Sequence, residues 1–448
     1  MAARVVVLGA GLCGLSASAE LRRRGLPHRL VERAAEPGGL ASTAEEAGYR
    51  FDRTGHLLHL RDPALRAELE GWMGPGALLE LERKSVVWSH GVYTRYPFQA
   101  NVHGLPAEIA HDCVAGFVRA RERLVEARAR GEELPEPVNF EDYVLRHFGE
   151  GIARHFMVPY NQKLWGVHPR EISAAWCERF VPRPSLDEVL RGAFGLPGPE
   201  LGYNARFLYP RFGIAELARA FAERAGSVEA GRSFEALHLA ERWALVAGER
   251  LPFDALVSSI PLDVLADAVL DPTPAFAESR TQLRKTSLYY LDLALNTPAE
   301  QPWHWCYVPD PDLPFYRIGC YSNFSAAMAP VGKASLYVEL ASREAPDLAA
   351  LLPVVAEELV RMRLLRAPEA IRFARLRKLE HAYVIFDARH AEAVATLRAE
   401  LERAGVLSTG RYGRWTYASM EDAIVDGREA ARWAEDRLAE RERAELGS

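Results

Sequence analysis

Three glycines near the start of the chain constrain its fold more than any other feature. Gly9, Gly11 and Gly14 form a G-x-G-x-x-G pattern between the β-branched run at residues 4–8 and a helical pattern. The first glycine allows a tight turn, the second lets the backbone approach a pyrophosphate, and the third lets helix and strand pack closely. Glu32 ends a second apolar run, where an acid bonds the ribose hydroxyls of a dinucleotide. The pattern predicts a dinucleotide-binding βαβ unit, and a glycine-rich turn without ligand is the simpler alternative.

The rest of the chain divides by its periodicity. With 448 residues it is long enough for two or three domains. Helical periodicity and period-two alternation each dominate long segments, which predicts a helical part and a second, antiparallel sheet. The expected elements are a helix from Leu12 to about Arg24, a strand at 28–32, helices within 102–195, a β-meander at 230–260, the antiparallel sheet at 285–345 and a helix at about 421–440.

Composition excludes several classes of function. The net charge of -6 is spread along the chain, so no basic patch suggests a nucleic acid or an anionic membrane as partner. No apolar run reaches the roughly 18 residues of a membrane-spanning helix, and no secretion signal is visible. Five scattered cysteines without CxxC pairing argue against disulfides and against a metal site. A reducing cytoplasm is the expected compartment. The oligomeric state stays open.

A second glycine-rich segment indicates which dinucleotide binds at the first one. Pro37-Gly38-Gly39-Leu40 is followed by Thr43 and by GYRFDRTGH at 48–56, which contains Gly55. Paired glycines remove side chains where a ligand must lie against the backbone. The segment resembles the extended FAD motif of the amine oxidase, protoporphyrinogen oxidase and UDP-galactopyranose mutase superfamily. The resemblance implies that FAD is the cofactor. An ordinary turn is the simpler alternative.

The C-terminal part carries a further element of the same superfamily. Gly410-Arg411-Tyr412-Gly413 precedes Trp415, Tyr417 and a helical segment that starts near Met420. The resemblance implies that this segment closes the FAD site and that Arg411 pairs with the pyrophosphate. It also implies that the N-terminus of the following helix faces the flavin, where negative charge accumulates on reduction. An exposed arginine in a turn is the simpler alternative.

Four other segments narrow the resemblance to one branch. They are FGEGIARHFMVPYNQKLWG at 148–166, YPFQAN at 96–101, GYNARFLYPRFGI at 202–214 and PFYRIGCYSNFS at 314–325. Together they resemble the UDP-galactopyranose mutases, including the eukaryotic-type branch. The fold so implied is α/β: a Rossmann-like FAD-binding domain with a helical domain and an antiparallel β-sheet substrate domain. The implied boundaries are 1–60, 205–265 and 400–448 for the FAD-binding domain, 100–200 for the helical domain, and 61–99 and 266–399 for the sheet domain.

The resemblance also implies roles for individual residues. Arg179 and Arg317 would grip the two phosphates of a nucleoside diphosphate sugar, and His56 would lie near the flavin ring; these three are the candidate catalytic residues. Asn204, Tyr383 and Tyr417 would hydrogen-bond the same diphosphate. The nucleobase and ribose would be lined by Tyr96, Gln99, Phe156, Asn161, Trp165 and Tyr307. The simpler alternatives are core aromatics for Phe156 and Trp165, salt bridges for the arginines, a turn residue for Asn204, and a satisfied loop histidine for His56.

The implied activity is the interconversion of pyranose and furanose forms of a nucleotide sugar, with reduced FAD as the nucleophile. NAD(P)H would be a candidate reductant, although no second dinucleotide motif is visible. Three positions depart from the family: Thr54 where Gly-Gly-His is usual, Phe324 where a tyrosine is usual, and Glu421 near a common asparagine. These departures affect the choice of sugar and nucleotide. The alternatives are a flavin-dependent oxidase or desaturase and a flavoprotein without catalysis.

Overall fold

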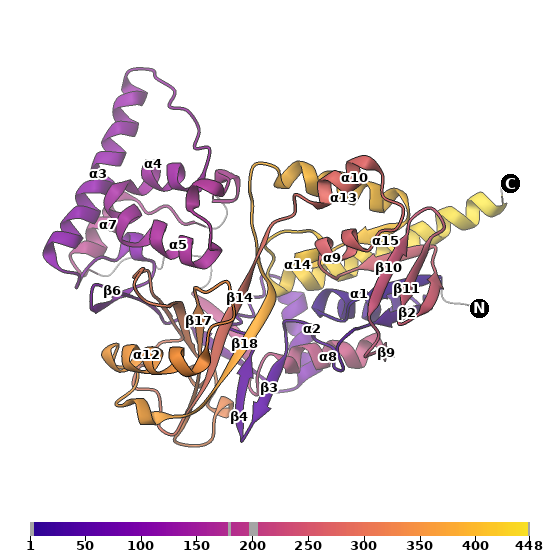
Figure 1. Ribbon diagram of the computed structural model, residues 1–448, viewed down its shortest axis with the longest axis horizontal. Helices are drawn as coiled ribbons and strands as arrows, with labels where there is room; N and C mark the ends of the chain where they lie inside the picture. The colour runs from indigo at the N-terminus through magenta and orange to yellow at the C-terminus, as the bar shows by residue number, and fades with distance from the viewer. Residues whose placement is uncertain (1–3, 178–180, 197–204, 447–448) are drawn as a thin grey trace.

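The computed structural model describes residues 4–177, 181–196 and 205–446, and it shows an α/β protein built around two sheets (Figure 1). The first sheet is parallel, in the order β19–β13–β1–β2–β9. Its strands come from distant parts of the chain: β1 (Val5–Leu8), β2 (His28–Val31), β9 (Val228–Glu229), β13 (Ala255–Ser258) and β19 (Val406–Ser408). The central strands β1 and β13 are buried along their whole length, which is typical of parallel sheets.

Helices pack on this sheet through small residues and leucines. The helix α1 follows Gly11 directly. The helix α15 crosses α1 closely, and Gly427 permits this because a Cβ at that position would lie only 2.3 Å from the Cys13 carbonyl oxygen. The helices of this part are α1 (Leu12–Arg23), α2 (Pro63–Met73), α8 (Ala215–Ala225), α9 (Leu262–Asp267), α10 (Pro274–Arg280), α13 (His390–Arg403), α14 (Gly410–Gly413) and α15 (Met420–Leu446). A three-stranded meander lies beside them: β10 (Phe234–His238), β11 (Trp243–Val246) and β12 (Glu249–Pro252).

The second sheet has the order β18–β14–β17–β16–β15–β6–β7. All its pairs are antiparallel except β15 with β6, which run parallel. The strands are β6 (Ser85–Ser89), β7 (Val92–Arg95), β14 (Lys285–Leu295), β15 (Trp305–Tyr307), β16 (Phe315–Cys320), β17 (Ala334–Leu340) and β18 (Ile371–Val384). One face packs on α12 (Leu348–Arg361), and the other faces the helical part. The predicted antiparallel sheet is thus confirmed, with one parallel pair that the alternation pattern did not indicate.

Glycines explain the packing of the helical part. A Cβ at Gly149 would lie 2.1 Å from the Gly116 carbonyl oxygen, and one at Gly151 would lie 2.2 Å from that of Asp112. The glycines of the FGEGI segment therefore let two helices touch backbone to backbone. The elements here are α3 (Ala107–Ala129), α4 (Phe140–Ile152), a π-helical turn (Ala153–Met157), α5 (Val158–Trp165) and α7 (Leu186–Ala193), with short 3-10 turns at Phe98–Ala100, Pro169–Glu171 and Ala174–Trp176.

Two short ribbons and small turns complete the fold. They are β3 (Thr43–Glu46) with β4 (Tyr49–Asp52), β5 (Leu78–Glu82) with β8 (Arg206–Pro210), α11 (Tyr321–Phe324), and 3-10 turns at Ala326–Met328 and Pro368–Ala370. Leu65 and Leu69 of α2 pack in the core of the parallel sheet. We therefore propose to count residues 61–82 with the FAD-binding part and to keep the other domain boundaries as predicted. No described helix has the length and apolar character needed to cross a bilayer.

Candidate active site

The dinucleotide loop has the geometry that its glycines predict. Gly9 adopts φ +89°, and a Cβ on Gly14 would lie 1.9 Å from the Gly9 carbonyl oxygen, so strand and helix pack as closely as backbone allows. A Cβ at Gly11 would meet only the Gly39 Cα, at 4.0 Å. The first turn of α1 contains no acidic side chain and no side-chain cap. Its N–H groups can therefore serve a phosphate.

The second glycine segment is bound to the first. Gly38 donates its N–H to the Ala10 carbonyl at 2.7 Å and pairs with Gly11 in a parallel bridge. Glu32 accepts the N–H groups of Ala10 at 2.7 Å and Ala34 at 2.8 Å, one on each carboxylate oxygen. This fixes the carboxylate at the end of β2 and leaves each oxygen a second lone pair for a ribose hydroxyl. These residues fit the ADP half of FAD.

Two other predicted cofactor residues have structural partners. Thr43 donates its hydroxyl to Asp52 at 2.6 Å and accepts the Ala215 N–H at 3.0 Å, which joins the β3–β4 ribbon to α8. Leu40 packs against the large aromatic core. Their contact with a flavin stays a prediction.

The C-terminal segment brings Arg411 into the interior. Its guanidinium lies 4.9 Å from the ring centroid of Tyr417 and donates to the carbonyls of Ala418 and Ala382. Tyr417 itself remains 43% exposed. Met420 is the first residue of α15 and packs against the parallel-sheet core. The pairing of Arg411 with a pyrophosphate stays a prediction.

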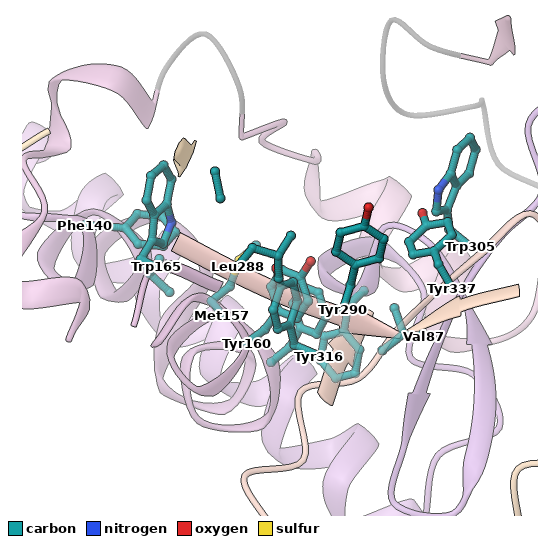
Figure 2. Close-up of a cluster of buried hydrophobic side chains, with 14 of the residues drawn as sticks. Val87, Phe140, Met157, Tyr160, Trp165, Leu288, Tyr290, Trp305, Tyr316 and Tyr337 are labelled. Carbon is teal, nitrogen blue, oxygen red and sulfur yellow. The ribbon is translucent and has the colours of Figure 1, made fainter. Parts of the chain in front are cut away.

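Four strands of the second sheet present a row of polar side chains toward the helical part. Tyr290 of β14 is opposite Glu339 of β17, which is opposite Arg317 of β16, which is opposite Tyr307 of β15. Directly opposed residues in antiparallel strands share a face. Figure 2 shows Tyr290 in the buried cluster of this face, between a group that includes Tyr160 and Tyr316 and a pair formed by Trp305 and Tyr337.

Arg317 is the centre of this row. Its Nη2 donates to Glu339 Oε1 at 2.6 Å and to the Tyr383 hydroxyl at 3.0 Å. Burial, the largest single influence, favours the neutral guanidinium, but Glu339 together with the neighbouring tyrosine hydroxyls raises the pKa of Arg317. Burial raises the pKa of Tyr383 to about 12, so its hydroxyl keeps a proton to donate. Arg317 is thus no surface salt bridge but an interior cation.

Unsatisfied polar atoms surround the same guanidinium. Within the described part of the chain, Arg317 Nε, Glu339 Oε2 and the Tyr316 hydroxyl are buried and have no hydrogen-bond partner. Buried polar groups of this kind are normally satisfied by water or ligand. The Arg317 Nε and the Tyr316 hydroxyl are thus unpaired donors, and their contact with an anionic ligand group stays a prediction.

His56 lies close to the same cations. Its Nδ1 is 3.2 Å from the Thr54 carbonyl oxygen, which agrees with the simpler interpretation of a satisfied loop histidine. Burial lowers the pKa of His56 to about 4, and Arg411, Arg317 and Arg53 act in the same direction. The ring is therefore neutral near pH 7. Gly55 before it fits only a glycine, because a Cβ there would lie 2.2 Å from the Tyr337 hydroxyl oxygen.

The predicted nucleoside end contains stacked aromatics. The rings of Tyr96 and Tyr307 stack with centroids 4.8 Å apart, and Tyr160 meets Tyr307 edge-on at 5.5 Å. Arg83 lies over the Tyr96 ring at 4.9 Å and donates to the Tyr307 hydroxyl at 3.0 Å. The structure therefore brings two predicted residues together and adds Arg83 and Tyr160, which sequence reasoning missed.

The other predicted residues of that end lie deeper. Phe156 stacks between Phe98 and Tyr160, with centroids 4.9 and 5.2 Å away, so neighbouring rings already cover it. Trp165 is buried and donates its indole N–H to Asn161 at 3.2 Å. Asn161 also donates to the Met157 carbonyl at 2.7 Å, and Gln99 donates to that of Pro182 at 3.1 Å. Direct contact of these four with a ligand stays a prediction. Arg179 and Asn204 lie outside the described residues.

The structure shows the surroundings of the three positions at which the sequence departs from the family that it resembles. Thr54 adopts φ +67°, a left-handed conformation that β-branched residues rarely take. Phe324 is buried and packs 4.7 Å from Trp305. Glu421 accepts the N–H groups of Arg61 and Asp62 at 2.8 Å each, so its carboxylate holds the chain that follows the His56 loop.

Glu339 was the most important residue that sequence reasoning missed. It stands in the otherwise apolar strand ASLYVEL, fully buried, opposite Arg317. A lone acid within an apolar strand was the available signal, because such a carboxylate needs a buried partner.

Fold and site together define a class of protein. A Rossmann-like dinucleotide-binding part is joined to a second, mostly antiparallel sheet, and this fold is shared with proteins described as a protoporphyrinogen oxidase and a putrescine oxidase. Residues 7–70 match the family model of an NAD(P)-binding Rossmann-like domain. The structure as a whole is similar to a reduced UDP-galactopyranose mutase, with a TM-score of 0.88 and 26% identity over 96% of this chain and 94% of that one. The resemblance to UDP-galactopyranose mutase-like flavoproteins is thereby confirmed.

More distant structures share the fold alone. A putative protoporphyrinogen oxidase from an Exiguobacterium species has a TM-score of 0.70 at 14% identity and covers 98% of this chain and 99% of that one. A putrescine oxidase has a TM-score of 0.66 at 16% identity with the same coverages. The named neighbours are a mutase and two oxidases, and this chain shares their fold.

Proposed function

We propose that this protein is an FAD-dependent mutase that interconverts the pyranose and furanose forms of a nucleoside diphosphate sugar. The similarity to UDP-galactopyranose mutase along nearly the whole chain supports the reaction type. The polar row on the second sheet supports the class of substrate, because a diphosphate requires buried cations and hydroxyl donors.

The residues present fit a flavin. The loop at Gly9–Gly14, the strap at Gly38 and Gly39, and Glu32 would hold its ADP half, and Gly55, His56 and Arg411 would lie toward its ring. When bound in its reduced form, the flavin supplies a nucleophilic nitrogen for the anomeric carbon. The protein's own residues position the sugar, grip its diphosphate and control protons around it.

Arg317 is the group that acts on the diphosphate. Its Nε has no hydrogen-bond partner within the described residues, so it can donate to a phosphate oxygen while Glu339 and Tyr383 hold Nη2. A guanidinium held in this way stabilises negative charge on a departing diphosphate without rearranging first. Arg179 is proposed as the second cation. Tyr383 and Tyr417 would donate hydroxyl protons to the same oxygens.

His56 contributes as a neutral group. With its pKa lowered to about 4, it does not add a fourth cation to the site formed by Arg317, Arg411 and Arg53. A neutral imidazole can accept or donate one hydrogen bond at each ring nitrogen according to its tautomer. We propose that it contacts the flavin ring and follows its redox state.

One observation carries the proposal. The partly buried Arg317, with its buried pair Glu339 and the hydroxyl of Tyr383, makes the inner face of the second sheet charged and hydroxyl-rich. An oxidase or desaturase of amines, porphyrinogens or isoprenoids would bind its substrate through a mostly apolar pocket, where an interior arginine would be out of place.

Anaerobic turnover tests the proposal. Purified protein with FAD is incubated with UDP-galactopyranose and other nucleotide sugars, before and after reduction with dithionite, and products are separated by chromatography. Turnover only after reduction is the expected result. Bleaching of oxidised FAD by an amine or porphyrinogen, without isomerisation of any nucleotide sugar, would show that the protein is an oxidase and not a mutase.

Two further parts of the proposal are the reductant and the compartment. NAD(P)H is proposed as the source of electrons, and anaerobic loss of the oxidised flavin band on adding NADPH or NADH tests it.

All five cysteines are free and buried, which agrees with a reducing compartment, so the cytoplasm is proposed.

A further inference from the structure

The helix α5 is joined to the second sheet by a lysine that the proposed chemistry does not use. Lys163 donates its Nζ hydrogens to the carbonyl oxygens of Val308 at 3.2 Å and Asp310 at 2.6 Å. These carbonyls belong to the loop that directly follows Tyr307 at the end of β15. The ammonium therefore holds the chain behind Tyr307 against α5.

An arginine makes the reciprocal connection from the sheet side. Arg343, which follows β17, donates from Nη2 to the carbonyl oxygen of Trp165, the last residue of α5. Gly166 makes room for it, because a Cβ at this position would lie 1.5 Å from Arg343 Nη2. The last carbonyl of α5 is thus bound by a cation from the segment that follows β17.

These two contacts join the two groups of predicted ligand-binding residues. The helix carries Asn161 and Trp165, and the strands β15 and β16 carry Tyr307 and Arg317, next to Glu339 of β17. Both bonds run from a charged donor to a backbone carbonyl, which makes them stronger than neutral hydrogen bonds and leaves a carbonyl unpaired when the cation is removed. Burial lowers the pKa of Lys163 to about 8, against the opposing influence of Asp310 and Asp312, so the ammonium is held in a desolvated place.

We propose that Lys163 and Arg343 are positioning residues that set the spacing between α5 and the strands β15–β17, and through it the affinity for the nucleoside diphosphate. This inference rests on the proposed function. Within the described residues, the hydrogen bonds of these two side chains go to the backbone at Val308, Asp310 and Trp165. Their loss should therefore weaken ligand binding without removing the groups that stabilise the departing diphosphate.

The test compares Lys163→Met and Arg343→Met with the wild type and with Arg361→Met. Arg361 is an exposed cation at the end of α12, on the other face of the sheet, and serves as the control. The dissociation constant for UDP is measured by calorimetry, and KM and kcat are measured with the reduced enzyme. FAD absorbance and the melting temperature report the fold.

We expect the UDP dissociation constant and KM to rise about tenfold in both variants, while kcat stays within about twofold and FAD stays bound. Lys163→Arg and Arg343→Lys should recover most of the affinity, which a merely packing role would not predict. Unchanged UDP affinity in both Met variants would overturn the inference. A wild type that binds no nucleoside diphosphate would instead overturn the proposed function.

A second pair of variants tests the position of Arg343 while its side chain and charge stay unchanged. Gly166 has φ +62° and Gly131, in the turn after α3, has φ +68°, but a Cβ at Gly131 would meet no atom within 4 Å. Alanine therefore introduces similar backbone strain at both positions and displaces Arg343 at only one of them. Gly166→Ala should weaken UDP binding as Arg343→Met does, and Gly131→Ala should not. Equal UDP affinity in the two alanine variants would contradict the inference.

Discussion

The Arg317 guanidinium donates to the Glu339 carboxylate at 2.6 Å, in a pair whose acid is fully buried and whose base keeps one fifth of its side chain exposed. A buried carboxylate held by one cation makes the two residues interdependent. Removing the cation leaves an uncompensated charge, which destabilises a protein strongly. The pair therefore gives Arg317 a structural role in addition to its proposed role in catalysis, and mutagenesis has to separate the two.

Arg317→Met should lose about 2–4 kcal/mol of transition-state stabilisation with the reduced enzyme. It should also lose about 3–5 kcal/mol of stability, because Glu339 is left unpaired. The double variant Arg317→Met/Glu339→Gln removes the buried charge and should recover the melting temperature, while kcat/KM stays low. Recovery of activity together with stability in the double variant would show that Arg317 only neutralises Glu339.

The dinucleotide half of the site could be predicted from the sequence because its physics is local. Gly9 at φ +89° and the contact between Gly14 and the Gly9 carbonyl depend on residues that are neighbours in the chain. The helix predicted from Leu12 to about Arg24 is observed at Leu12–Arg23 for the same reason. The start and end of such a helix can be predicted because the residues that determine them lie at the helix ends themselves.

The substrate half could not be derived in this way, because strand register creates it. Glu339 meets Arg317 only through the pairing of β16 with β17, and the parallel β15–β6 pair joins segments more than 200 residues apart. The resemblance to a family supplied Arg317 and Tyr383 as candidates but gave no information on Glu339, Arg83 or Lys163. The lone acid in an apolar strand marked Glu339 as unusual, but its partner, and the roles of Arg83 and Lys163, became visible only as side chains in contact.

Gly11→Val should abolish FAD binding while the fold survives. The backbone at Gly11 has φ -74°, which valine can adopt, and a Cβ there would have only the Gly39 Cα within reach. The side chain would instead fill the space where a pyrophosphate approaches the backbone. Flavin absorbance after reconstitution and circular dichroism measure the two effects. Gly14→Val is the matched control and should lose both, because its Cβ would lie 1.9 Å from the Gly9 carbonyl oxygen. If Gly11→Val still bound FAD, the pyrophosphate would not bind at this loop.

Thr54→Gly should raise the free energy of unfolding by about 1 kcal/mol. Thr54 holds φ +67°, and a glycine takes this conformation without the steric penalty of a β-branched side chain. Thr94→Gly, at a buried position of the ordinary strand β7, is the control and should lower the free energy of unfolding. Chemical denaturation of the FAD-bound protein measures both. A loss of stability at Thr54 as large as at Thr94 would show that packing of the threonine outweighs its backbone strain.

Asp292→Asn should change how stability depends on pH. Burial raises the pKa of Asp292 from 3.8 to about 7, although Arg377 donates to it at 3.2 Å. Between these two values the folded protein holds a proton that the unfolded chain has released, so this group lowers stability as pH rises from about 4 to about 7. Asparagine keeps the shape and an acceptor for Arg377 but cannot ionise. The stabilities of variant and wild type should agree near pH 4 and diverge with rising pH, until the variant is more stable by roughly 3–5 kcal/mol at pH 8. Melting temperatures measured across this pH range check the divergence. A difference that is constant across this range, or a variant that is less stable at pH 8, would mean that Asp292 is charged in the folded protein throughout and that Arg377 fully offsets its burial.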